Sequence, residues 1–96
     1  MTCKMRHFAS LEEFLGAARA TIMRLREHYK GATIDGLVVT FNAFLGYGRN
    51  AMTDNWAELL EPLKSVRDLE GYRLGDKELG DLRVLIEAVE SIVYRP

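Results

Sequence analysis

The fold class depends on how one nearly uncharged run, residues 34–47, is interpreted. After Asp35 this run carries no charge until Arg49. Interpreted as a helix, it places its large apolar side chains on one stripe with i, i+3, i+4, i+7 spacing; they are Ile34, Leu37, Val38, Phe41, Phe44 and Leu45. Val39, Ala43 and Tyr47 lie off this stripe, so most of the helix circumference is apolar. Such a helix is either buried at the centre of a bundle or shared with a partner.

Interpreted as a strand, the same run alternates almost as regularly, and its Val-Val-Thr-Phe stretch has the composition of a strand. Its two glycines also weigh against a helix, since each costs about 1 kcal/mol relative to alanine in a helix interior. We predict a helix, because the rest of the chain is helical in pattern. A lone strand would have no partner for its backbone hydrogen bonds. An α+β fold with a strand at residues 34–47 is the alternative.

The stretch after residue 9 predicts a helix with a capped start. Ser10 and Glu13 form a Ser-x-x-Glu capping box, and Gly31 provides a stop after about Lys30. Apolar residues recur at intervals of 4-3-4-3-4, the heptad spacing that suits packing against another helix. We expect this seam to serve as core or as a dimer interface together with part of the central run; its residues are Leu11, Leu15, Ala18, Ile22, Leu25, Leu37, Val38 and Phe41.

A third helix is predicted after the Gly46-Tyr47-Gly48 connection. It begins near Thr53 or Asp54, either of which can cap it, and runs to about Leu69. Pro62 lies inside this pattern. Because proline removes one backbone donor and clashes with the preceding turn, we expect a kink or two shorter pieces.

A last helix is predicted from a cap at Asp76 to about Tyr94. Residues 1–9 are expected to form a flexible lead-in. Four amphipathic helices on short connections usually make an up-down bundle or a small irregular array. We therefore predict a single all-α domain over residues 1–96.

Composition points to one soluble domain in a reducing compartment. Thirteen basic and fourteen acidic residues give a net charge of −1, which provides no general attraction to nucleic acid or to an anionic membrane. The single cysteine, Cys3, excludes an internal disulfide framework. No apolar run reaches the ~18 residues that a membrane span needs, and the N-terminus does not resemble a secretory signal. We expect a cytoplasmic protein without a membrane partner.

The chain carries no pattern that predicts catalysis or cofactor binding. His7, His28 and Cys3 are too few and too far apart for structural zinc, which usually takes four ligands. Cys3 lies near the terminus, a poor place to hold a nucleophile. Acidic pairs lie at predicted helix starts, where the helix dipole favours them, and on predicted solvent-exposed faces. The Gly46-Tyr47-Gly48 stretch matches neither a P-loop nor a dinucleotide-binding turn. We predict neither an enzyme nor a cofactor.

A basic stripe on the first helix provides the alternative function. Arg19, Arg26 and Lys30 share one side of that helix, with Arg24 nearby, and such a stripe can neutralise phosphates. Glu27 interrupts the stripe, and the other helices lack the polar, basic face of a recognition helix. A nucleic-acid-binding regulator is therefore the alternative prediction, and a solvated charged face is the simpler interpretation.

By elimination, the sequence favours a small regulatory protein that binds and occludes another protein. The central run has more apolar surface than one side of a small bundle needs, which also predicts a homodimer. A helix face would dock on the partner, as in an adaptor, an anti-activator of a transcription factor, or an immunity or inhibitor protein. Residue types enriched at binding hot spots lie mostly in or near the predicted loops. The candidate partner-binding residues are Met23, Phe44, Tyr47, Arg49, Trp56, Tyr72 and Arg73.

Overall fold

The computed structural model describes residues 5–46 and 55–94. Within these ranges the chain forms four α-helices, one short 3-10 helix and no strand. The elements are α1 (Leu11–His28), α2 (Ala32–Gly46), α4 (Trp56–Glu70), η1 (Gly71–Arg73) and α5 (Asp76–Val93). The predicted all-α class is confirmed, and the central run is a helix through Gly46.

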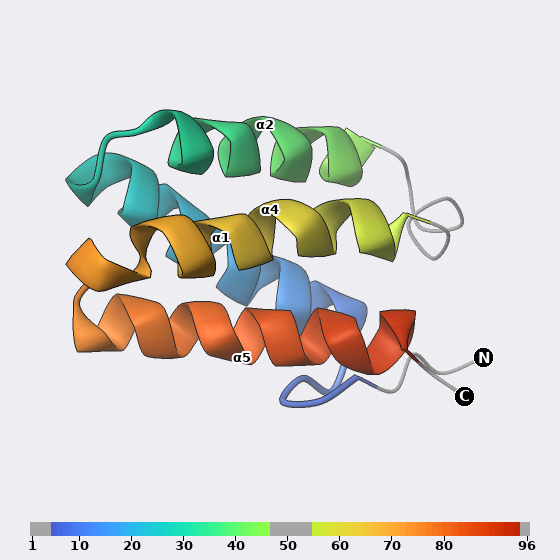
Figure 1. The fold of residues 1–96 in the computed structure, drawn as a ribbon. Helices are drawn as coiled ribbons and strands as arrows, with labels where there is room; N and C mark the ends of the chain where they lie inside the picture. Colours follow the sequence, from blue (N-terminus) through green and yellow to red (C-terminus); the bar gives the residue numbers. More distant parts are fainter. Residues whose placement is uncertain (1–4, 47–54, 95–96) are drawn as a thin grey trace.

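Three of the helices form a layer, and α1 covers one side of it. Figure 1 shows α2, α4 and α5 side by side with α4 in the middle, while α1 crosses behind them. Phe14 of α1 meets Trp56 of α4 with 5.3 Å between ring centroids, and Trp56 meets Phe44 of α2 at 5.0 Å. These three rings join the layer to the helix that covers it.

The predicted seam packs inside the single chain. Its buried members are Ala18, Ile22, Leu25, Leu37, Val38 and Phe41, and its half-buried members are Leu11 and Leu15. All eight residues belong to the core of one chain or pack against it. The seam therefore serves as core, which was one of its two expected roles.

The start of α1 agrees with the capping prediction. The Glu13 backbone N–H donates to Ser10 Oγ at 3.1 Å, so Ser10 is the N-cap. The end differs, because the helix stops at His28 and Tyr29 is extended (φ −130°, ψ 131°). This earlier end directs the Tyr29 side chain toward the start of α5, where its hydroxyl is bonded.

Helix α4 continues through Pro62 as one element, so of the two expected outcomes, a kink or two shorter pieces, the division into two pieces is wrong. The proline removes the N–H that would bond the Glu58 carbonyl. Five buried side chains hold both halves of the helix on one core face; they are Trp56, Leu59, Leu60, Leu63 and Val66. The predicted caps Thr53 and Asp54 lie outside the described residues.

Helix α5 is capped at Gly75, and Asp76 is its first residue instead of its cap. The Gly75 N–H donates to the Tyr29 hydroxyl at 3.1 Å, and that hydroxyl donates to Glu78 Oε1 at 3.2 Å. In a capping box the carboxylate at this position reaches the cap N–H directly. Here the hydroxyl of Tyr29, the residue after α1, lies between them.

Arg73 adds a second link at the same end of the molecule. Its guanidinium donates to the Lys30 carbonyl at 2.6 Å and to the Glu70 carboxylate, and it lies 5.8 Å from the centroid of the Tyr29 ring. We call this group of residues the Tyr29 junction; its members are Tyr29, Lys30, Glu70, Arg73, Gly75 and Glu78. The junction ties the α1–α2 connection to the α4–α5 connection.

Residues 5–8, which fall in the predicted flexible lead-in, make defined contacts. Met5 is buried and pairs with Phe8 across a tight turn. The Phe8 ring packs edge-on against Phe14, with 5.5 Å between centroids. The turn therefore covers one end of the core between α1 and α5.

Two hydrogen bonds hold this turn on α5. The Arg6 N–H donates to Ser91 Oγ at 3.1 Å, and the His7 imidazole lies 2.6 Å from Glu87 Oε1. The hydrogen bond from His7 lowers the pKa of Glu87 below its ordinary value. His7 has a φ of 73°, in the left-handed region that glycine adopts most readily. The turn therefore combines a strained backbone with a short polar contact.

Candidate partner-binding surfaces

Two of the predicted partner-binding residues lie in the core. Phe44 is 1% exposed and Trp56 is 2% exposed, and the two rings pack against each other. The structure does not expose them to a partner, as their predicted role in partner binding would need, because the single chain buries both where α1, α2 and α4 meet. The Trp56 indole N–H has no acceptor among the described residues.

The remaining predicted residues differ in their surroundings. Met23 is half-buried and packs against the core. Arg73 is held in the Tyr29 junction. Tyr72 is 87% exposed and is available to a partner. Tyr47 and Arg49 lie outside the described residues.

Helix α2 exposes an uncharged face at the edge of the layer. This outer face consists of five exposed residues, at intervals of 4-3-4-3; they are Ala32, Gly36, Val39, Ala43 and Gly46. Val39, at its middle, is 68% exposed. Asp35 is the only charged residue of the helix. The sequence predicted an apolar surplus on this run, either buried at the centre of a bundle or shared with a partner; in the structure α4 occupies the middle of the layer and α2 lies at its edge (Figure 1).

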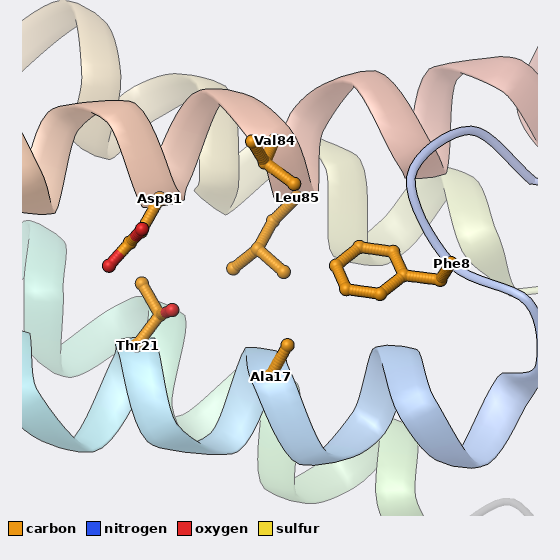
Figure 2. Close-up of a pocket in the computed structure, with 6 residues that line it drawn as sticks. All are labelled: Phe8, Ala17, Thr21, Asp81, Val84 and Leu85. Carbon is orange, nitrogen blue, oxygen red and sulfur yellow. The ribbon is translucent and has the colours of Figure 1, made fainter.

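A groove runs between α1 and α5 on the opposite side of the molecule from this edge. Figure 2 shows one part of it, a hollow of about 200 Å³ lined by Phe8, Ala17, Thr21, Asp81, Val84 and Leu85. The Phe8 ring points into this hollow from the N-terminal turn. A second hollow of about 250 Å³ continues from it, shares Ala17, Thr21 and Asp81, and adds Ala20, Arg24 and Lys77. We call the two together the α1–α5 groove.

The α1–α5 groove has a charged end. Lys77 Nζ lies 3.4 Å from Asp81 Oδ2, one turn away on α5. Arg24, across the groove on α1, is exposed and has no ion pair within the described part of the chain. Two cations therefore flank one carboxylate at this end. This arrangement could not be predicted from the sequence, because Arg24 and Lys77 are far apart along the chain.

Between α4 and α5 the charges are paired with one another. Lys64 Nζ lies 3.2 Å from the Tyr94 hydroxyl and 3.3 Å from Glu90, and these hydrogen bonds raise the pKa of Lys64. The Arg67 guanidinium lies 2.9 Å from Asp68 and lowers the pKa of that carboxyl. These charged side chains are therefore paired within the chain.

The predicted basic stripe is exposed but divided. Arg19 and Arg26, seven residues apart, lie within about 20° of each other around α1, at about 100° per residue. Arg24 lies about 140° from Arg19 and faces the α1–α5 groove instead. Glu27 is also exposed, beside the same stripe. The stripe therefore reduces to Arg19, Arg26 and, beyond the helix end, Lys30.

The described residues contain no group of three or more His, Cys, Asp or Glu side chains that could hold a metal ion. None of the helices in residues 5–46 and 55–94 has the length and apolar character needed to cross a membrane. Comparisons with protein-family models, with curated proteins and with solved structures found no match to the chain. The geometry of the surfaces is therefore the basis for a functional proposal.

Proposed function

We propose that this protein is a small regulatory module that acts by binding another polypeptide through the outer face of α2. One observation carries the proposal. An edge helix presents four turns of exposed Gly, Ala and Val, with Asp35 and Asn42 at its margin. Helices on the surface of a globular protein ordinarily place charged and polar residues opposite the core. A helix face made of small apolar residues is suited to contact with another polypeptide.

The size of the side chains suits a helical partner. Glycine and alanine let a second helix approach closely, and the 4-3-4-3 spacing of the face is that of a heptad seam. Small side chains also limit the apolar area exposed before a partner binds. A module of this kind acts by occlusion, as an adaptor, an anti-activator or an inhibitor does, and we place it in the cytoplasm.

A second copy of the chain fits this face by symmetry. Val39 lies in the middle of the outer face, with two small residues on each side of it. Two copies of α2 can therefore pack antiparallel with their contact centred on Val39 of each copy. Gly36 then meets Ala43 and Ala32 meets Gly46, the reciprocal pattern of a two-fold interface. The two Asp35 side chains would be about 12 Å apart along the axes, beyond the Debye length of about 8 Å at physiological salt.

The dimer through this face is expected to be weak. Stable interfaces bury about 800 Å² on each partner, and one face of a 15-residue helix with a single valine knob offers much less. A weak self-contact leaves the face open to competition from a partner helix. The same surface would then serve either self-association or the binding of a partner, but not both at once.

Sedimentation equilibrium across a wide concentration range tests the proposal. We expect a monomer–dimer equilibrium for the wild type and a folded monomer for Val39→Glu, because the charge would be buried at the two-fold axis. Ala57→Glu, at an exposed position of α4, is the matched control and should associate like the wild type. If Val39→Glu changes neither self-association nor the proteins cross-linked to the chain in cell extract, the proposal is wrong.

Nucleic-acid binding is a second candidate, with narrower support. Arg19 and Arg26 are exposed and make no ion pair with any described residue, so both are available to phosphates. The division of the stripe by Glu27 and the position of Arg24 reduce the number of phosphates that one surface can neutralise. Because nonspecific affinity grows with that number, this candidate ranks second.

A further inference from the structure

We propose that the α1–α5 groove receives an acidic amphipathic helix from a partner protein. This site is separate from the outer face of α2, and the inference does not rest on self-association there. Three features support it: the size of the hollow, the incomplete cover on the layer, and the charge at one end of the groove.

The hollow has the size of a side-chain pocket. Small-molecule sites usually enclose 300–1,000 Å³, whereas this hollow holds about 200 Å³. Its walls are mostly apolar, with Leu85, Val84 and Ala17 around it and the Phe8 ring closing one end (Figure 2). A leucine or phenylalanine carried by another chain matches this size and chemistry.

Helix α1 covers only part of one side of the layer formed by α2, α4 and α5, so space remains there for another helix. Helix α1 crosses behind α2, α4 and α5 and is the only described helix on that side (Figure 1). Residues 5–8 cover α5 at one end, through Met5 and Phe8. Further along, the α1 side of the groove consists of Ala17, Ala20 and Thr21, whose short side chains let a helix lie close. A helix placed beside α1 would extend the cover over α5.

The charge at this end of the groove determines which charge a bound helix should carry. Lys77 and Arg24 face the groove, and Asp81 is the only carboxylate among the described residues that line it, so this end carries one surplus positive charge. An incoming carboxylate can meet Arg24 without displacing the Lys77–Asp81 pair. Ala17 and Arg24 are seven residues apart on α1, which is about 10 Å. The occupant therefore carries an apolar anchor and an acidic residue at i and i+7, as helix-in-groove ligands do.

Two synthetic peptides test the proposal. Each is a capped 17-residue alanine-rich helix with a central leucine; one carries glutamate seven residues on both sides of it, and its twin carries lysine there. Binding is measured by fluorescence anisotropy at low salt, and the site is mapped by methyl NMR of Val84 and Leu85. We expect the acidic peptide to bind at least about tenfold more tightly and to shift both methyl groups, with the preference lost in high salt.

Matched variants assign the effect to the groove. Arg24→Glu should abolish the preference for the acidic peptide, whereas Arg26→Glu, the same change on the far side of α1, should leave it. Ala20→Phe should block the groove, whereas Ala57→Phe, at an exposed alanine of α4, should not. Circular dichroism checks that each variant folds.

The outcomes separate this inference from the proposed function. Equal binding of the two peptides, no binding at millimolar concentration, or shifts confined to other helices would each overturn the groove assignment. Val39→Glu should leave peptide binding unchanged, and Ala20→Phe should leave sedimentation unchanged. Either proposal can therefore fail while the other stands.

Discussion

Replacing Tyr29 by phenylalanine removes one hydroxyl and with it two links between distant parts of the chain. That hydroxyl accepts from the Gly75 N–H at 3.1 Å and donates to Glu78 Oε1 at 3.2 Å, across 46 and 49 residues of sequence. The aromatic ring stays, so packing against Arg73 is retained. The variant therefore isolates the contribution of the two hydrogen bonds.

The expected loss follows from the two bonds. A hydrogen bond between neutral groups contributes about 0.5–1.5 kcal/mol net, and one to a charged group about 1.5–3 kcal/mol. Both lie in a half-buried setting, where water can partly replace them. We expect Tyr29→Phe to lower the free energy of unfolding by about 1–2 kcal/mol. For a domain of this length each kcal/mol corresponds to about 4–8 °C in Tm.

Urea and thermal unfolding followed by circular dichroism measure this loss. Tyr72→Phe is the matched control, because Tyr72 is 87% exposed and its hydroxyl has no partner among the described residues. It should change stability by less than about 0.5 kcal/mol. Gly75→Ala provides an independent test, since a Cβ there would force the Glu78 carboxylate to move and so disturb the hydrogen bond that it accepts from Tyr29. If Tyr29→Phe is as stable as Tyr72→Phe, the junction does not stabilise the fold and our reasoning fails.

Three further predictions concern the N-terminal turn and the basic stripe. Since the pKa of Glu87 is lowered in the folded chain, its contribution to stability is present above pH 4.5 and is lost as the pH falls through the folded value; the stability difference between wild type and Glu87→Gln should therefore shrink on acidification. At φ 73°, His7→Gly should be more stable than His7→Ala by about 1 kcal/mol in chemical denaturation, because alanine keeps the backbone strain. The wild type should pass through heparin at low salt; retention that Arg26→Glu abolishes and Arg83→Glu does not would favour nucleic-acid binding instead.

The helices could be predicted because their signals are local. The Ser10 cap and the i, i+3, i+4 stripes specify where apolar faces form, and most of these positions are buried; Leu45, on the predicted stripe of residues 34–47, is 37% exposed instead. The choice of a helix for residues 34–47 rested on the absence of a second strand, an argument about hydrogen-bond partners that holds for the described part of the run. Pro62 does not divide α4 into two pieces, because the buried face on both sides of it outweighs one lost backbone bond.

The surfaces could not be predicted, because they depend on tertiary placement. An apolar surplus on residues 34–47 has the same sequence signature at the centre of a bundle and at its edge. Phe44 and Trp56 belong to residue types found at hot spots, yet the same rings fill cores equally well. The α1–α5 groove joins Arg24 to Lys77 across 53 residues, and the Tyr29 junction has no local pattern at all.

The Tyr29 junction and the N-terminal turn lie at the two ends of the α1–α5 groove. At one end Tyr29 holds the end of α1 against the start of α5, close to Arg24 and Lys77. At the other, the turn of residues 5–8 is held on α5 and places Phe8 in the hollow. The middle of the groove contains short side chains and little else. A gap held open at both ends keeps its width when empty, and such preorganisation lowers the entropic cost of binding. Loosening either end should therefore weaken an occupant of the groove without touching the outer face of α2.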